Sequence, residues 1–210
     1  MQKAQPSLLK ALQPEEIARF KQLAELMQMK AGQVIFAEED FADAVYIVEQ
    51  GHVKIYHNSV AGKNSIMSIR GPGDLFGVAA VLLREKRCAF AETMGEGAIW
   101  RMEGKTFVDM VYECPRLAME VALTHGRYLR DAETAIGQLL SMDADQRVAW
   151  LLLRLASPVS TPEGEKIRIS VRLTHQDLAS MIGSCRQTTT TALGRLQRAG
   201  IINFGKRYID

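Results

Sequence analysis

One stretch near the C-terminal end of the 210-residue chain, residues 173–202, constrains the fold more than any other part of the sequence. Thr174 followed three residues later by Asp177 is a helix-starting pair, in which each side chain caps a backbone N–H of the other. The helical apolar spacing breaks at Gly183, and a second helix is expected to follow and to end at Gly200, a residue suited to the left-handed position after a helix. Two helices joined by a tight turn that contains glycine predict a helix-turn-helix.

The second helix carries four consecutive threonines, residues 188–191, although β-branched residues are weak helix formers. Short hydroxyls and methyl groups suit contacts with phosphate oxygens and thymine, so the run favours a helix that lies in the major groove of DNA. Arg186 can donate two hydrogen bonds to guanine, and Gln187 can pair in the same way with adenine. Ser184, which is expected to start the helix, forms a capping pair with Gln187, so the alternative is that Gln187 only closes the helix start.

The predicted DNA-contacting surface draws on both helices and on the segment after them. It comprises Arg186, Gln187, Thr188, Thr190, Thr191, His175, Gln176, Lys206 and Arg207. Three residues of the second helix, Thr188, Ala192 and Leu196, are expected to face inward and to hold the unit together.

Charge in this segment agrees with a nucleic-acid partner. Residues 166–209 hold eight Lys or Arg residues against one acid, a net charge of +7 in a chain whose total is +2. A basic block confined to one module is typical of a phosphate-binding face. Residues 201–209 predict a strand, a basic turn and a second strand, a wing with Lys206 and Arg207 at its tip. The alternative is that these two charges are merely solvated, but their place directly after a recognition helix favours DNA.

Composition and motifs exclude several other classes of protein. With 47% hydrophobic and 24% charged residues the chain is typical of a globular protein. No apolar stretch reaches the length of a membrane span and no signal peptide is found, so we expect a cytoplasmic protein with no membrane partner. The scattered Cys88, Cys114 and Cys185 suit neither a disulfide framework nor a metal motif. We find no nucleophile with its base, no phosphate loop and no metal-ligand cluster, and therefore expect no enzyme, no catalytic residues and no metal site.

The first hundred residues have the pattern of a β-domain. After an expected N-terminal helix over residues 8–29, interrupted at Pro14, short alternating runs are separated by glycine-containing turns such as those at Gly51 and at residues 71–74. Many short strands bounded by turn residues predict an all-β sandwich or barrel. The expected strands are residues 33–36, 44–48, 52–56, 65–69 and 98–102.

From Cys114 the spacing becomes that of one long helix, which begins at Pro115 and continues to Met142. It carries two apolar stripes. The first has the heptad spacing of a coiled-coil seam and is expected to pair with a second copy of the chain, while the second could pack on the chain's own β-domain. The first stripe is Ala118, Val121, His125, Tyr128, Ala132, Ala135, Leu139 and Met142, and the second is Ala122, Leu129, Ile136 and Leu140. Asp143 is expected to cap a further helix over residues 144–156, followed by a strand over residues 167–171.

In this order, a β-roll, a long helix and a winged helix-turn-helix resemble the Crp/Fnr (catabolite activator) superfamily of bacterial transcription regulators. Besides the helix-turn-helix, the matching residues are Tyr46-Ile47-Val48 with Gly51, the Gly71-x-Gly73-Asp74-Leu75-Phe76-Gly77 segment, and Arg87. The resemblance implies an α+β fold with a β-roll effector domain similar to cyclic-nucleotide-binding jelly rolls (1–113), a dimerisation helix (114–142) and a winged helix-turn-helix DNA-binding domain (143–210).

The resemblance also implies partners. It implies a homodimer that binds double-stranded DNA at a palindromic site, with RNA polymerase as a further candidate partner. The second helix is most similar to the recognition helix of the carbon-monoxide-sensing haem activators, and the family's base-reading positions fall on Arg186, Gln187 and Thr191. The alternative is a cyclic-nucleotide-binding regulatory module without DNA output, which the basic winged segment argues against.

The effector is the part of the resemblance that fits least well. The implied pocket residues are Gly77, Val78, Arg87, Cys88, Tyr128 and Ala132. Cyclic-AMP-binding members carry a ribose-binding Glu where this chain has Val78, although the phosphate-pairing Arg87 is kept, and their adenine-contacting Thr and Ser fall on Ala132 and Glu133. Each hydroxyl left without its partner costs about 1–3 kcal/mol, so we expect the effector not to be cyclic AMP.

Haem lacks its expected ligands as well. The carbon-monoxide sensors take them from a Cys and a His at the positions of Gly77 and Ala79. The cofactor therefore stays unidentified, with Cys88, Cys114 and His125 as remaining sensor candidates.

Overall fold

A computed structural model of the protein describes residues 12–58, 64–156, 169 and 171–203. The chain divides into two compact units, and the division falls between Arg130 and Asp131, inside the long helix α5 (Pro115–Ser141). The three-part division at residues 113 and 142 stays a prediction. No helix in the described part of the chain is long and apolar enough to cross a membrane.

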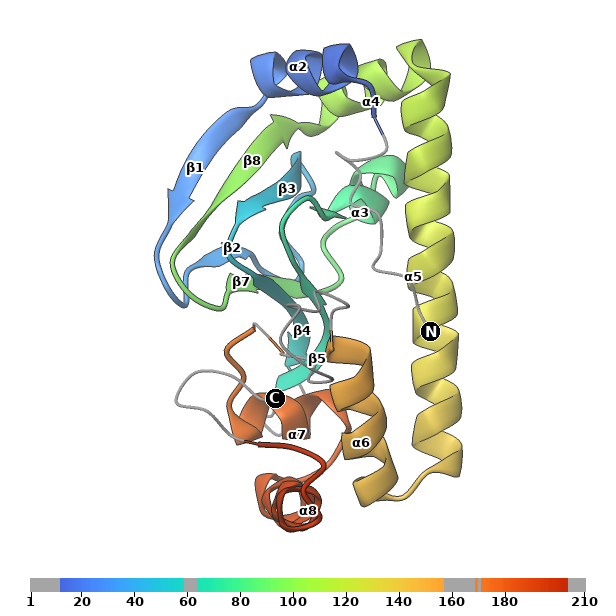
Figure 1. The fold of residues 1–210 in the computed structure, drawn as a ribbon. Helices are drawn as coiled ribbons and strands as arrows, with labels where there is room; N and C mark the ends of the chain where they lie inside the picture. Colours follow the sequence, from blue (N-terminus) through green and yellow to red (C-terminus); the bar gives the residue numbers. More distant parts are fainter. Residues whose placement is uncertain (1–11, 59–63, 157–168, 170, 204–210) are drawn as a thin grey trace. The chain divides into compact units, whose positions relative to one another are not determined.

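The first unit is built around two four-stranded sheets, which confirms the β-domain expected from the sequence (Figure 1). One sheet has the order β1-β8-β3-β6, and the pairs β1–β8, β3–β8 and β3–β6 are antiparallel. The other has the order β2-β7-β4-β5, and the pairs β2–β7 and β4–β7 are antiparallel. The strands are β1 (Glu25–Met29), β2 (Val34–Phe36), β3 (Ala44–Gln50), β4 (Val53–Asn58), β5 (Asn64–Arg70), β6 (Leu75–Phe76), β7 (Phe90–Thr93) and β8 (Gly97–Glu103).

The N-terminal helix is shorter than the sequence predicts. Helix α2 (Pro14–Leu23) begins after Gln13, whose backbone amide donates to Glu16 Oε2 at 2.7 Å, and it ends at Ala24, which is extended. Residues 25–29, expected to be helical, instead form β1 and pair with β8. The physical reason is tertiary, because β8 supplies backbone partners along the whole of β1 and Met29 is buried in the roll. Residues 8–11 lie outside the described residues.

Three helices in addition to α2 pack on the roll, namely α3 (Val78–Leu83), α4 (Gly104–Glu113) and the first part of α5. Helix α5 begins at Pro115, as predicted. The apolar side chains of these helices share one core with β3 and β8. Large side chains of this core are those of Phe20, Phe107, Ile47, Met102, Met110 and Leu117. This core fixes the start of α5 against the roll.

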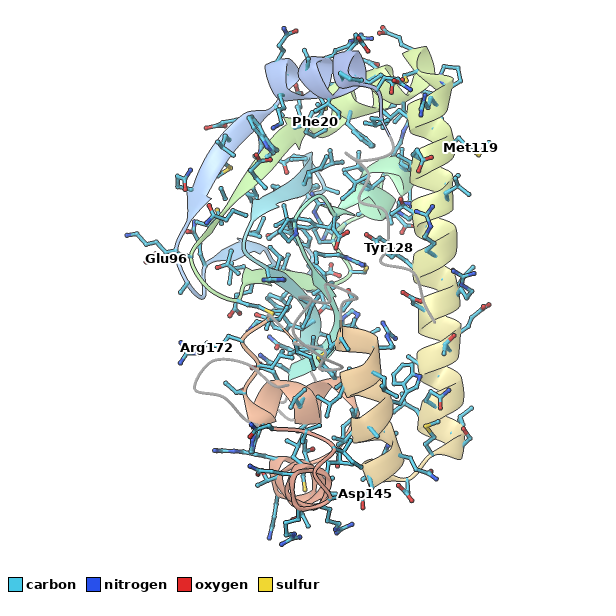
Figure 2. The ribbon with its side chains drawn as sticks, viewed as in Figure 1. Phe20, Glu96, Met119, Tyr128, Asp145 and Arg172 are labelled. Atoms are coloured by element: carbon cyan, nitrogen blue, oxygen red, sulfur yellow. The ribbon has the colours of Figure 1, made fainter. Side chains whose placement is uncertain are left out.

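The first part of the stripe predicted to form the dimer seam packs on the roll instead, whereas its later members Ala132 and Leu139 are exposed. Val121, predicted to lie in the dimer seam, is 5% exposed and belongs to the core of the roll. Tyr128 of the same predicted seam donates a hydrogen bond from Oη to the carbonyl of Leu75, at 3.2 Å. Figure 2 shows Tyr128 and Met119 on opposite sides of α5, and Met119 is exposed.

The stripe predicted to pack on the β-domain is the one that lies at the surface. Leu129, Ile136 and Leu140 are exposed, whereas Leu117 and Thr124 are buried on the opposite face. Both faces have heptad spacing and apolar residues, so periodicity alone cannot tell which of them faces the roll. The tertiary contacts decide it.

The second unit contains the helix-turn-helix, as predicted. Helix α6 (Ala144–Leu155) is capped by Asp143, and it packs on α7 (His175–Met181) and α8 (Arg186–Arg198). The shared core consists of Val148, Leu151, Leu152, Ile169, Leu178, Ile182, Ala192 and Leu193. Gly200, after α8, has the positive φ expected of it, +71°, and Gly183, in the predicted turn between α7 and α8, has a φ of +62°.

The predicted wing falls mostly beyond the described part of the chain. Residues 201–203 do not form the expected first strand, and residues 204–210, including Lys206 and Arg207, lie outside the described residues. Of the strand expected over residues 167–171, only Ile169 and Val171 are described, and Ile169 is buried. The wing therefore stays a prediction.

Candidate nucleic-acid interface

The starts of α7 and α8 are set by different capping residues. Thr174 and Asp177 cap α7 reciprocally, as predicted, with the amide of Asp177 donating to Thr174 Oγ1 at 3.1 Å. Helix α8 is capped by Cys185 rather than by Ser184, and the amide of Thr188 donates to Cys185 Sγ at 3.4 Å. The capping role considered for Gln187 is therefore wrong, because the cap lies one residue later than the sequence pattern suggests.

Arg186 and Gln187 are consequently left with their donors and acceptors at the surface. Both are exposed in the first turn of α8, and neither side chain has a hydrogen-bond or ion-pair partner among the described residues. Arg186 also lines an open depression of about 460 Å³ together with Thr174, His175 and Gln176, so predicted contact residues from both helices share one surface. Unpaired side-chain donors at an exposed helix start can bind base edges or phosphates.

The inward face of α8 differs from the predicted one by one residue. Thr188 is exposed, and Thr189 is the threonine that is fully buried, beside Ala192 and Leu193. A buried hydroxyl needs a partner, and Thr189 Oγ1 donates to the carbonyl of Cys185 at 3.0 Å. Leu196 packs against this core, as expected.

A hydrogen bond between side chains connects α7 to α8. Nδ1 of His175 lies 3.0 Å from Oγ1 of Thr190. The two residues come from the first turn of one helix and the middle of the other, so the contact helps to fix how the predicted reading face of α8 is presented.

Part of the basic block is used within the protein. Arg195 of α8 forms an ion pair with Asp145 of α6 and is not available in this form to a phosphate. Arg172, Arg186 and Arg198 are exposed, and Figure 2 shows Arg172 projecting outward. The other four basic residues lie outside the described residues; they are Lys166, Arg168, Lys206 and Arg207.

The predicted effector residue Arg87 is buried, with 2% of its surface exposed. Its guanidinium donates to the carbonyl of Gly77 at 2.5 Å and to the carbonyl of Ala44, and it lies 4.4 Å from the ring centre of Phe36. Burial lowers the pKa of Arg87. The arginine is thus bound by the roll itself through Nη1 and Nη2, while its buried Nε has no hydrogen-bond partner among the described residues.

The other predicted effector residues do not gather around one space. Gly77 touches Arg87, because a Cβ built on Gly77 would lie 3.0 Å from Arg87 Nη1, and its φ of +77° also requires glycine. Val78 is buried in the core of the roll, and Cys88 is exposed. Ala132 is exposed. Within the roll, the buried Val78 and the carbonyl-bound Arg87 therefore do not form a site that suits a cyclic nucleotide.

Three residues near the turn at residues 71–74 were not predicted as part of any site. Asp74 accepts a hydrogen bond from the amide of Gly71 at 2.8 Å, and its burial raises the pKa of the carboxyl group. Burial lowers the pKa of His52, which interacts with Asp74. The guanidinium of Arg70 lies 3.5 Å from the ring centre of Tyr128. The Gly-x-Gly-Asp pattern signals the turn and Arg70 directly precedes it, but nothing in the sequence places His52 beside it.

The remaining sensor candidates have partners of their own. Nδ1 of His125 lies 2.8 Å from the carbonyl of Val121 in the preceding turn of α5. Cys114 Sγ donates to Glu16 Oε1 at 3.0 Å. Within the described residues, no three His, Cys, Asp or Glu side chains form a group that could hold a metal ion. These described positions therefore supply no set of haem ligands.

Known proteins resemble both parts of the chain. Residues 26–113 match the cyclic nucleotide-binding domain, and residues 146–210 match the Crp-like helix-turn-helix domain. A CRP-like cAMP-activated global transcriptional regulator from Mycobacterium tuberculosis is 27% identical over 95% of this chain and 89% of its own length.

Solved structures share the fold. The structure of FixK2 from Bradyrhizobium japonicum has a TM-score of 0.78 at 23% identity and covers 89% of this chain and 91% of its own. A mutant of CooA from Carboxydothermus hydrogenoformans has a TM-score of 0.79 at 22% identity and covers 99% of this chain and 92% of its own. At these identities the likeness concerns the fold alone, so the similarity of the recognition helix to haem activators says nothing further about a cofactor.

Proposed function

Since the chain belongs to the Crp/Fnr family of transcription regulators, with a cyclic nucleotide-binding-like domain ahead of a DNA-binding helix-turn-helix, we propose that it binds a palindromic operator as a homodimer. An effector other than cyclic AMP, bound in the β-roll, controls this binding. The protein acts in the cytoplasm, and RNA polymerase is a further candidate partner. As a binding protein it needs no catalytic residues.

The observation that supports the proposal most strongly is that the side chains of Arg186 and Gln187 are exposed and, among the described residues, unpaired. Both side chains are exposed in the first turn of the second helix, and neither has a partner within the described residues. In a helix-turn-helix the first turns of the second helix enter the major groove, where Arg binds guanine and Gln binds adenine through paired hydrogen bonds. Leaving these groups without intramolecular partners costs little in water and keeps them available to bases.

The proposed dimer rests on the exposed stripe of α5. Seven positions with alternating steps of three and four residues are all exposed, namely Met119, Ala122, Gly126, Leu129, Glu133, Ile136 and Leu140. Apolar side chains at this spacing suit a paired helix, and a second copy of the same helix presents the same stripe. A two-fold dimer places its reading helices on half-sites about 34 Å apart, which explains why the operator should be palindromic.

The proposed effector differs from that of the Mycobacterium tuberculosis relative. Arg87 is bound to two carbonyls of its own roll, and Val78 stands in the core where a ribose acceptor would be needed. Calorimetric titration of the ligand-stripped protein with cyclic AMP should therefore show no heat of binding. Binding at micromolar concentration would refute this part of the proposal and leave the DNA-binding part untouched.

The DNA-binding part is tested by selecting duplexes from a random library with the full-length protein and measuring affinity for the enriched sequence. Arg186→Ala removes one contact in each half-site, so it should lower that affinity by about 2–6 kcal/mol, or roughly 30- to 25,000-fold, and remove the sequence preference. Arg198→Ala is the matched control, because Arg198 is also exposed on α8 but lies in its last turn, and it should keep the preference. An Arg186→Ala variant with unchanged preference would contradict the assignment of Arg186.

The second candidate is a regulatory module that binds a ligand but not DNA. Failure of the folded protein to bind any duplex at low salt, where phosphate contacts are strongest, would favour it.

A further inference from the structure

The four threonines of α8 share a feature that the sequence does not show, because every one of their hydroxyl groups is bonded within the protein. The Thr188 hydroxyl lies 3.1 Å from Cys185 Sγ, Thr189 donates to the Cys185 carbonyl at 3.0 Å, Thr190 lies 3.0 Å from His175 Nδ1, and Thr191 donates to the Gln187 carbonyl at 3.0 Å. In a run that suggests four polar contacts to DNA, each hydroxyl group thus already takes part in a hydrogen bond within the protein, and a hydroxyl that donates its proton there cannot donate it to DNA as well.

Thr191 is the member of the run with the clearest consequence. It is exposed, and its hydroxyl points back along the helix to the carbonyl four residues earlier. The methyl group is the other heavy atom on its Cβ, and it is therefore the part of the side chain that remains available for contact with DNA. A hydrogen bond from this hydroxyl to a base would require the existing bond to break, whereas an apolar contact through the methyl group requires no change.

Gln187 lies one helical turn before Thr191 on the same face of α8. A glutamine side chain pairs with adenine. Of the four standard DNA bases, thymine alone carries a methyl group in the major groove, where a threonine methyl can pack on it. Both side chains therefore suit adjacent A·T pairs. Neither Thr189, which is buried, nor Thr190, whose hydroxyl connects α8 to His175, offers this combination.

We propose that this protein recognises the 5-methyl group of a thymine in each half-site through the methyl group of Thr191, beside an adenine bound by Gln187. The inference rests on the proposed function, because it assumes that α8 lies in the major groove. It adds that one element of specificity is an apolar contact and not a hydrogen bond.

The test uses the duplex enriched by the wild-type protein, with each thymine replaced in turn by deoxyuridine, which lacks only the methyl group. Loss of one buried methyl group lowers affinity about fourfold. Replacement at the symmetric position of both half-sites should therefore raise the Kd about 15-fold. Replacement of the other thymines should change it less than twofold.

Two substitutions separate the methyl group from the hydroxyl. Thr191→Ser keeps the hydroxyl and removes the methyl group, so this variant should bind thymine and deoxyuridine duplexes equally. Thr191→Val keeps a methyl group and removes the hydroxyl, and it should retain the 15-fold difference within a factor of two. Because Thr191 is exposed, both variants should fold as the wild type does, which circular dichroism verifies.

The outcomes distinguish this inference from the proposal on which it rests. If the enriched duplex binds tightly but no deoxyuridine replacement weakens it, the methyl contact is refuted and DNA binding stands. If Thr191→Val loses the difference while Thr191→Ser keeps it, the hydroxyl is the reading group and the inference is wrong. If no sequence is enriched and no duplex is bound by the folded protein, both the inference and the proposed function fail.

Discussion

Removing two side chains from the exposed stripe of α5 should dissociate the proposed dimer. Leu129 and Ile136 lie one heptad apart, and 63% and 57% of their surfaces are exposed in the single chain. Truncation of either to alanine removes three carbon atoms, each worth about 0.8 kcal/mol when fully buried. Because only about three-fifths of each side chain remains for a partner to cover, the loss is about 1.4 kcal/mol per side chain.

The double variant Leu129→Ala/Ile136→Ala loses four side chains in a two-fold dimer. The expected loss is about 5.6 kcal/mol, which raises the dimer dissociation constant by about four orders of magnitude. Sedimentation equilibrium over a range of micromolar concentrations measures this constant directly. Since both residues are exposed in the monomer, the thermal unfolding of the dissociated chain should stay close to that of the wild type.

Two exposed leucines off the stripe provide matched controls. Leu83 on α3 and Leu153 on α6 are 65% and 73% exposed, so their truncation removes similar apolar surface from solvent-facing positions. Neither Leu83→Ala nor Leu153→Ala should change the association of the chain. A double variant of the α5 stripe that dimerises as tightly as the wild type, or a control that dissociates to the same extent, would refute the assignment of this stripe to the dimer.

The remaining predictions concern stability. Arg87→Met leaves two buried carbonyls without donors and should lower the free energy of unfolding by about 3 kcal/mol, measured by urea titration; a loss below about 1 kcal/mol would contradict the structural role of Arg87. Gly183→Ala and Gly200→Ala each force alanine to a positive φ, which should lower the free energy of unfolding by about 1–2 kcal/mol. Any larger loss in Gly183→Ala comes from Leu139, whose Cδ2 lies 3.3 Å from the added Cβ. This additional loss should disappear when Leu139→Ala is combined with Gly183→Ala. Burial lowers the pKa of His52 in the folded protein, so the imidazole binds a proton more readily in the unfolded chain. The free energy of unfolding should therefore fall as the pH drops below about 6.5, and this contribution should be absent in His52→Gln. A His52→Gln variant with the same pH dependence as the wild type would assign that dependence to other groups.

Local signals determined the helix-turn-helix. Thr174 with Asp177 caps α7 as expected, and Gly183 and Gly200 adopt the positive φ that their positions require. Caps and glycine turns involve residues three or four positions apart, so their physical causes are contained in a short stretch of sequence. For the same reason the start of α5 at Pro115 was predicted correctly.

Where two local structures were nearly equally compatible with the sequence, the prediction was wrong. Ser184 and Cys185 are both able to begin α8, and the shift of one residue moved the buried threonine from 188 to 189. Residues 25–29 formed a strand because β8 lies beside them, and the paired residues are 68 to 76 positions apart in the chain. Pairing across such a separation leaves no periodic signal in the segment itself.

The sequence by itself determined which modules the chain contains and which residues of α8 have the chemistry to read DNA. Only the tertiary structure decided which face of α5 packs on the roll, that Arg87 is bound to Ala44 and Gly77, and that the hydroxyl of Thr191 is already bonded. The physical reason is that residue type sets what a side chain is able to bind. Whether its donors and methyl groups remain available depends on neighbours that only the folded chain brings together.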